Sequence, residues 1–269
     1  RAPTVEDLQS KDNFFYKLLS QGRKPDSETL LVMRALSLFK VIGTSPGKLD
    51  EDRKHIREYF CESVSTLRFN EIIRQQEKRR IIQRIADTIR ITPRPLAVAL
   101  AADFIPVFTD DWEPVLNKIE EFNLLTFFIK RFEELEFLEE NKGKEIGEWL
   151  IKKGLPFQKA EYLLSGRAAS EVFRILCTLC PQDSLDVAQN ALGNLTRDEL
   201  LKVKGIRSSL TRGLQTLAWN EETFAPAATL LLKFAAAENE TWSNNSTGTF
   251  VQLFKLYLSG TKLPAIKRL

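Results

Sequence analysis

Apolar residues recur at three- and four-residue spacing through the first part of the chain, which is the pattern of amphipathic helices. Helices are predicted at Val5 to Leu19 and at Ser27 to Val41, the second opened by Ser27 as an N-terminal cap. Leu49 to Phe60 and Ser65 to Lys78 repeat the pattern on a more highly charged background. A run of helices is therefore predicted ahead of residue 80.

The spacing changes from helical to β-like between Arg80 and Ile91. Isoleucines dominate this stretch and Ala86 to Thr88 supplies a turn, so a β-hairpin is predicted. Thr92 and Pro93 are predicted to open the next helix, because threonine caps helices well and proline is tolerated at the first helical position. Helices, a short hairpin and a further helix make the order of a winged-helix domain. We place this domain at residues 25–107, after a helical lead-in at residues 1–24.

From Asp111 onward the pattern is helical and is interrupted by Gly, Pro and Asn. The predicted helices are Asn123 to Phe137, Ala168 to Cys180, Pro181 to Leu192, Thr196 to Val203, Ser208 to Ala218, Glu221 to Ala237 and Ser246 to Leu258. Short connections between them favour stacked antiparallel pairs, although no strict repeat period is present. The predicted fold class is therefore mostly α: a winged-helix-like domain with one short hairpin, followed by an α-solenoid-like helical array at residues 108–269.

Composition limits the classes of function. The chain has 269 residues, of which 43% are hydrophobic, so it can bury a substantial core. Lys and Arg number 39 against 36 Asp and Glu, which leaves a net charge of only +3, so any basic surface must be local. Three cysteines give no disulfide framework, and no run of about 18 apolar residues is present. We expect a cytoplasmic protein that does not enter a membrane.

No residue pattern in the chain predicts catalysis, cofactor binding or metal binding. Gly43 to Lys48 fails as a P-loop, because its glycine spacing is too short and Leu49 replaces the metal-binding Ser or Thr. Cys177 and Cys180 have C-x-x-C spacing but lack further ligands, so they are interpreted as core residues. The single histidine, His55, lies on a charged helix that is predicted to be solvated. We expect a non-enzymatic chain.

A local cluster of cations surrounds the predicted third helix and hairpin of the winged helix. Its members are Arg74, Lys78, Arg79, Arg80, Arg84, Arg90 and Arg94. Such residues contact phosphates in winged-helix proteins that bind DNA, but charged helices are also commonly just solvated. A second nucleic-acid motif, Leu200 to Ile206, resembles a helix-hairpin-helix, with Arg207 in place of the second glycine. Partner binding and DNA binding both remain open.

Tryptophans mark the C-terminal region as a candidate interface. Aromatic side chains concentrate binding energy where proteins meet, and they also fill the space between neighbouring helices. Trp219 is predicted to lie in the core, whereas Trp242 is a candidate interface residue. Asn245 and Ser246 are suited to the turn and cap before the last helix.

Several segments resemble a known family. They are Ala35 to Gly43, Ile89 to Ala97, Gly154 to Ser165 with Glu171 to Leu176, Ala218 to Phe224, Asn239 to Asn245 and Leu258 to Pro264. Together they are similar to the winged helix and the following helical region of bacterial STAND-type NTPases, which are multidomain signalling ATPases often associated with anti-phage defence. The resemblance covers residues 31 to 269 and is strongest from Leu210 onward.

The resemblance implies a regulatory role in signal transduction. In that family this region lies beyond the ATPase core and couples its nucleotide state to sensor or effector parts. The implied partners are therefore the upstream ATPase core, other domains of the same protein and a protein trigger, and ATP is expected for the full-length protein only. Because Arg1 is not an initiator and Met33 is the only methionine, we expect an internal piece of a longer protein. The alternatives are a winged-helix DNA-binding protein and a helical interaction scaffold.

Overall fold

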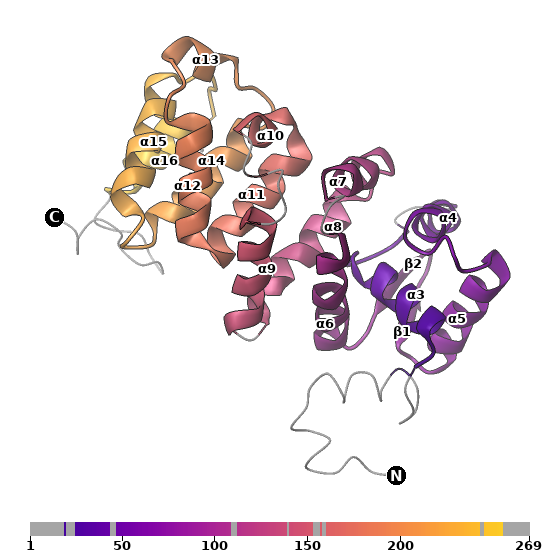
Figure 1. Ribbon diagram of the computed structural model, residues 1–269. Helices are drawn as coiled ribbons and strands as arrows, with labels where there is room; N and C mark the ends of the chain where they lie inside the picture. The colour runs from indigo at the N-terminus through magenta and orange to yellow at the C-terminus, as the bar shows by residue number, and fades with distance from the viewer. Residues whose placement is uncertain are drawn as a thin grey trace. The chain divides into compact units, whose positions relative to one another are not determined.

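The computed structural model describes residues 19, 25–43, 47–108, 112–138, 140–152, 157, 160–242 and 245–254 (Figure 1). Its contacts divide the chain into two compact units. Residues 1–108 and 118–138 form the first unit, and residues 109–117 and 139–269 form the second. The predicted boundary after residue 107 lies beside the first division. The return of residues 118–138 to the first unit is a feature that the sequence pattern does not predict.

The first unit has the element order of a winged helix. Its elements are α3 (Ser27–Ser37), α4 (Lys48–Phe60), α5 (Thr66–Lys78), β1 (Ile82–Ile85), β2 (Thr88–Ile91) and α6 (Arg94–Phe104). Between α3 and α4, Ile42 forms an isolated antiparallel bridge with Ile89 of β2. The predicted mostly α-helical fold with one short hairpin is confirmed. The lead-in helix at Val5 to Leu19 lies outside the described residues except for Leu19.

Local side-chain contacts explain where these helices begin. Asp26, rather than the predicted Ser27, caps α3, because its carboxylate accepts from the Thr29 backbone N–H at 2.8 Å. Ser65 caps α5 by accepting from the Arg68 backbone N–H at 3.2 Å. Each cap satisfies one of the backbone donors that a helix start leaves without a partner.

The hairpin packs one edge against the core of the first unit. β1 and β2 pair in antiparallel register, with Ile82 opposite Ile91 and Ile85 opposite Thr88. Ile82, Ile89 and Ile91 are buried, whereas Ile85 near the turn is half exposed. Gly43 follows the bridge at Ile42 with a φ of +78°, and a Cβ atom there would lie 2.3 Å from the Asp87 carbonyl oxygen. Only glycine therefore fits this close approach of the loop to the hairpin turn.

The start of α6 differs from the prediction. Pro93 is the N-cap of α6 and Arg94 is its first residue, so Thr92 does not cap the helix. The Thr92 hydroxyl instead donates to the Arg80 carbonyl oxygen at 2.9 Å, which ties the hairpin exit to its entrance. The peptide bond between Thr92 and Pro93 is cis.

The helix predicted at Asn123 to Phe137 is in fact two elements of the first unit. The chain continues from α6 through η1 (Ile105–Phe108), α7 (Trp112–Glu121), α8 (Leu125–Phe132) and η2 (Glu133–Phe137). Asn123 has a positive φ of 59°, which a helix interior does not accept. Phe128 of α8 lies edge-on to Phe39 at the end of α3, with ring centroids 6.4 Å apart. This contact anchors the returning segment to the winged helix.

The second unit is helical throughout its described residues. Its elements are α9 (Glu140–Lys152), α10 (Ala160–Ser165), α11 (Arg167–Leu179), α12 (Pro181–Leu192), α13 (Arg197–Lys202), α14 (Arg207–Ala218), α15 (Phe224–Ala236) and α16 (Ser246–Gln252). Most of the predicted helices are present, and α12 has the predicted bounds. Most of the Gly154 to Ser165 motif and all of Leu258 to Pro264 lie outside the described residues.

Helix α14 is the centre of the second unit. It packs against α11, α12, α15 and α16. Gly213 permits the closest of these contacts, because a Cβ atom there would lie 3.0 Å from the Phe173 ring of α11. Thr196 and Glu199 form a reciprocal capping box at the start of α13. None of the described helices combines the length and apolar character that crossing a bilayer requires.

Candidate functional site

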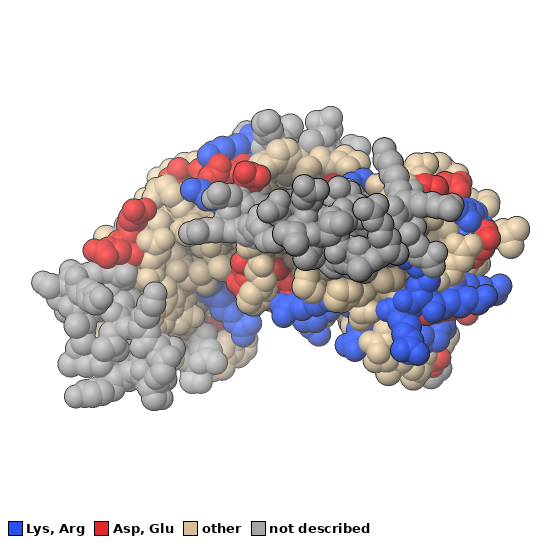
Figure 2. All heavy atoms as spheres, turned by 90° about the horizontal axis from the view of Figure 1, so that it is seen from below, with Lys and Arg blue, Asp and Glu red and all other residues tan. Residues whose placement is uncertain are grey.

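Five of the seven predicted cations lie exposed on α5 and the hairpin, and we call them the basic surface: Arg74, Lys78, Arg80, Arg84 and Arg90. Figure 2 shows Lys and Arg side chains gathered over the part of the first unit that contains α5 and the hairpin. An open groove of ≈ 520 Å³ lies within this surface. Its lining includes Arg80, Arg84 and Gln83.

Two cations of the basic surface are oriented by contacts within the hairpin region. The Arg84 Nε atom donates to the Glu77 carboxylate at 2.9 Å. Arg90 and Gln83 are opposite one another in the strand register, and the Arg90 guanidinium donates twice to the Gln83 amide oxygen, at 3.0 and 2.7 Å. In the described part of the chain, Arg74, Lys78 and Arg80 have no carboxylate within ion-pair distance.

The cations are close enough to affect one another. Arg53 of α4 lies behind the basic surface and is largely buried. Burial lowers the pKa of its guanidinium, Asp50 and Glu77 raise it, and the positive charges of Arg84 and Arg74 lower it. Arg53 therefore feels both the cations of the basic surface and the carboxylates beside them.

The other two predicted cations belong elsewhere. Arg79 is half buried and donates to the Leu19 carbonyl oxygen, and burial lowers the pKa of its guanidinium. Arg94 pairs with Glu134 at 3.1 Å and lies 4.6 Å from the centre of the Phe137 ring. Both residues are thus engaged by contacts within the first unit, so we leave them out of the basic surface.

The N-terminal half of α5 is engaged within the first unit. The Arg68 guanidinium pairs with Asp26, Glu28 and Glu71 at distances of 3.4, 3.0 and 3.1 Å. Leu67 beside it is 81% exposed. The cations available to a ligand are therefore concentrated at the C-terminal end of the helix and on the hairpin.

Glu134 forms a second charged cluster that the sequence pattern does not reveal. Its buried carboxylate pairs with Lys40 at 2.9 Å, with Arg94 and with the buried Arg131. Arg131 also donates from Nε to the Ser37 carbonyl oxygen at the end of α3, at 3.0 Å. The cluster thus fixes the segment 118–138 to α3 and α6.

The cysteines, His55 and the loop at Gly43, which the sequence offered as candidates for chemistry, make packing and hydrogen-bond contacts within the fold. Cys177 and Cys180 are buried in the core, as the sequence predicts, and burial raises the pKa of Cys180 to about 12. His55 is half buried rather than solvated, because its ring stacks on Phe122 at 4.2 Å. The Gly43 N–H donates to the buried Asp52 carboxylate at 3.0 Å. Among the described residues, no three His, Cys, Asp or Glu side chains are arranged to hold a metal ion.

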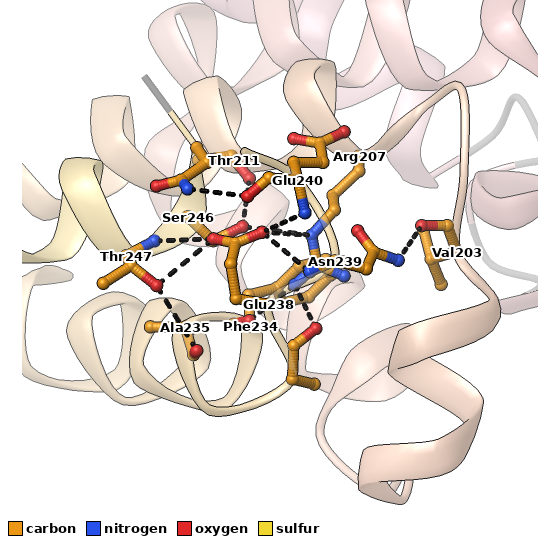
Figure 3. A network of polar contacts seen from close by, with 12 residues as sticks. Val203, Arg207, Thr211, Phe234, Ala235, Glu238, Asn239, Glu240, Ser246 and Thr247 are labelled. Atoms are coloured by element: carbon orange, nitrogen blue, oxygen red, sulfur yellow. Dashed lines mark hydrogen bonds and ion pairs between the residues drawn. The ribbon is translucent and has the colours of Figure 1, made fainter. Parts of the chain in front are cut away.

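A buried arginine network joins three segments of the second unit (Figure 3). Arg207 is fully buried and donates to the carbonyl oxygens of Leu200 at 2.9 Å, Ala237 at 2.8 Å and Phe234. It also donates to the Ser246 hydroxyl at 3.2 Å. The end of α13, the end of α15 and the start of α16 are therefore held by one side chain. The sequence showed Arg207 only as the residue in place of the second glycine of a helix-hairpin-helix motif, and did not predict this burial.

Glu238 completes the network from the side that faces solvent. Its carboxylate lies 3.6 Å from Arg207 and accepts from the Thr247 backbone N–H at 2.9 Å (Figure 3). Burial raises the pKa of this carboxyl, but backbone N–H groups of Thr247, Glu240 and Asn239, together with Arg207, outweigh burial and hold the pKa below its usual value.

Acidification is expected to weaken the second unit through Glu238. Because the folded-state pKa is depressed, the carboxylate stabilises the fold above its unfolded pKa of about 4.5 and loses this contribution as pH falls below that value. The stability difference between the wild type and Glu238→Gln should therefore shrink between neutral pH and about pH 3.5. Native-state hydrogen exchange of the α15 and α16 amides at both pH values measures it. The exposed Glu222→Gln variant is the control, and an equal change there would contradict the assignment.

Trp242 is exposed, in agreement with its selection as a candidate interface residue. Its side chain is 56% exposed, whereas Trp112 is buried and Trp219 is only half buried instead of fully in the core. Asn245 caps α16, as predicted, by accepting from the Gly248 N–H at 2.8 Å.

Comparison with family models, with curated proteins and with solved structures finds no match to this chain.

Proposed function

We propose that this chain is a non-catalytic regulatory and relay region of a bacterial STAND-type signalling NTPase, acting in the cytoplasm in anti-phage defence. The observation that supports the proposal is the winged-helix order of the first unit, followed in the same chain by a helical second unit. This is the order that the resemblance of its segments implies. ATP would bind to an ATPase core that precedes these residues.

In this proposal the chain transmits a change of nucleotide state to sensor or effector parts. Signalling ATPases of this kind switch between a closed and an assembled state through repacking of whole units. In this proposal each unit moves as a body, and the contacts of Glu134 and Arg207 stabilise the interior of the first and the second unit. The chain leaves the first unit after Phe108, returns at Lys118 and leaves again after Leu138, so these units are linked by more than one connection.

The test begins with the gene. We expect the sequence upstream of Arg1 to encode a strand followed by a Gly-rich loop that ends in Gly-Lys-Ser or Gly-Lys-Thr. The full-length protein should then assemble with ATP, as measured by analytical ultracentrifugation, and should not assemble when the lysine of that loop is changed to alanine. A start codon close to Arg1, or assembly that ignores nucleotide, would contradict the proposal.

A second candidate function is binding to duplex nucleic acid. The basic surface favours it, because α5 and the hairpin occupy the positions of the recognition helix and wing of DNA-binding winged helices. Arg74, Lys78 and Arg80 have no carboxylate partner among the described residues, so their charges are available to phosphates. Because the N-terminal half of α5 is engaged by its own ion pairs, we expect contacts with the backbone rather than with bases.

Substitutions that reverse the charge of the basic surface test whether it binds duplex DNA. A protein with Arg74, Lys78 and Arg80 all changed to Glu should bind a DNA duplex more weakly, and the slope of log affinity against log salt should fall by roughly three. Fluorescence anisotropy with a labelled duplex gives both values. The control reverses Lys202, Lys204 and Arg212, which are exposed on the second unit. Equal losses in the two variants would show that only net charge matters.

A further inference from the structure

The turn from Glu238 to Trp242 is held in one conformation by the Arg207 network. The Glu238 carboxylate accepts from the backbone N–H groups of Asn239 and Glu240, both at 3.0 Å. Asn239 donates to the Leu201 carbonyl oxygen at 2.7 Å, which ties the turn to α13. A ligand that binds this turn would therefore lose little entropy by ordering it.

Trp242 is displayed at the end of this fixed turn. Asn245 donates from its side chain to the Glu240 carbonyl oxygen at 2.9 Å, and its backbone N–H donates to the Trp242 carbonyl oxygen at 3.2 Å. Asn245 thus holds the carbonyl oxygens of Glu240 and Trp242, while 56% of the Trp242 side chain remains exposed. An exposed tryptophan on a fixed backbone is the arrangement found at the centres of protein interfaces.

The nearby Glu240 carboxyl has no cation of its own. Among the described residues no Lys or Arg lies within ion-pair distance of it, and the nearby Arg207 is used by Glu238 and by carbonyl oxygens. Burial raises the pKa of Glu240, Arg207 lowers it, and the charge of Glu238 raises it. A cation from a partner would give this carboxylate an ion pair of its own.

We propose that the turn Glu238–Trp242 is a docking site for a protein segment that carries Lys or Arg. The cation would lie over the Trp242 ring and pair with the Glu240 carboxylate. Aromatic rings attract cations through the negative potential of their faces, and Glu240, two residues before Trp242 on the same turn, supplies a carboxylate that can form a charge-assisted hydrogen bond. The Glu240 carboxylate and the face of the Trp242 ring repel phosphate. This surface is therefore suited to a positively charged partner, whereas the basic surface is suited to a negatively charged one.

In the proposed relay, a basic protein segment would bind the helical array at this docking site. The biological role of the docking site rests on the proposed function. Binding itself requires no nucleotide and no upstream core, so it can be tested with the chain alone. A failure of peptide binding and a failure of nucleotide-dependent assembly are therefore distinguishable.

The experiment uses a hexa-arginine peptide with blocked ends and a matched hexa-glutamine peptide. The chain contains four tryptophans, so labelling with 5-fluorotryptophan gives a ¹⁹F resonance for each, and Trp242→Phe assigns the one of interest. We expect the Trp242 resonance to shift with the arginine peptide and not with the glutamine peptide. No shift at Trp242 would overturn the proposal.

Affinities of variants test the two contacts separately. By anisotropy of labelled hexa-arginine, Trp242→Ala should weaken binding about tenfold or more, and Glu240→Gln about fivefold. Glu222→Gln makes the same charge change at an exposed position before α15 and should leave the affinity unchanged. If Glu222→Gln weakens binding as much as Glu240→Gln does, the peptide responds only to overall charge and the docking site is refuted.

Discussion

Replacing Arg207 with alanine is expected to lower the free energy of unfolding of the second unit by about 3–5 kcal/mol. The guanidinium is fully buried and supplies donors to carbonyl oxygens of Leu200, Phe234 and Ala237. Alanine would leave these buried carbonyl oxygens without their donor, and the buried volume would stay empty. Glu238 would lose its only cation among the described residues while keeping its backbone N–H donors, so the main cost is that of unsatisfied buried acceptors and an empty cavity.

Native-state hydrogen exchange measures this effect unit by unit, which global unfolding of a two-unit chain does not. Protection should fall in α13, α15 and α16 and stay unchanged in α3 to α6. Arg212→Ala is the matched control, since Arg212 lies on the same helix but is exposed. A loss of less than about 1 kcal/mol in Arg207→Ala would show that water replaces the guanidinium, and the network would then not be an anchor.

Glu134 is expected to produce the second large effect. Glu134→Ala should lower the stability of the first unit by about 3 kcal/mol or more, because Lys40, Arg94 and Arg131 would then face one another without a carboxylate. Arg131 is itself buried, and burial lowers the pKa of its guanidinium while Glu134 raises it. Removal of Glu134 therefore leaves a buried cation whose remaining partner among the described residues is the Ser37 carbonyl oxygen.

Exchange in residues 125–137 should report this change directly. The segment is attached to α3 and α6 through Glu134 and Arg131, so its amides should lose protection first. Glu136→Ala removes an exposed carboxylate two residues away and should have little effect. Unchanged protection in Glu134→Ala would mean that apolar contacts such as that between Phe39 and Phe128 hold the segment without the charges.

The buried clusters around Glu134 and Arg207 are relevant to the proposed relay. A unit that repacks as a body must resist deformation within itself, and the two clusters supply that resistance in different units. Variants that weaken an anchor should therefore damage nucleotide-dependent assembly of the full-length protein even though neither residue lies on an exposed surface. The basic surface and the Trp242 turn can be altered without touching either anchor, which allows binding and integrity to be separated.

Helices and the hairpin were predictable because their signals are local. Ser65 and Thr196 cap helices that begin one residue later, and Pro181 opens α12 where the sequence places it. The isoleucines from Ile81 to Ile91 identify the hairpin. The helix at Asn123 to Phe137 failed because its periodicity persists through the change from α8 to the 3-10 turn η2, so periodicity alone could not locate the break.

The candidate site was only partly predictable. Arg74, Lys78, Arg80, Arg84 and Arg90 were found because they are near in sequence and happen to share a surface. The contacts of Arg79 with Leu19 and of Arg94 with Glu134 could not be predicted, because they join residues that are distant in the sequence. The exposure of Trp242 was proposed from residue type alone, and its fixed display by Asn245 and Glu238 was not apparent.

The sequence by itself determined most of the helices, the hairpin and the winged-helix order, because caps, turns and helical periodicity depend on residues within about four positions of one another. Tertiary structure alone decided the roles of Arg207 and Glu134. Arg131 and the Ser37 carbonyl oxygen that it binds are 94 positions apart, and Arg207 and Ser246 are 39 positions apart. Such pairs leave no periodic trace in the sequence. They form because folding buries their charges together, and a buried charge must find its partner wherever the chain supplies one.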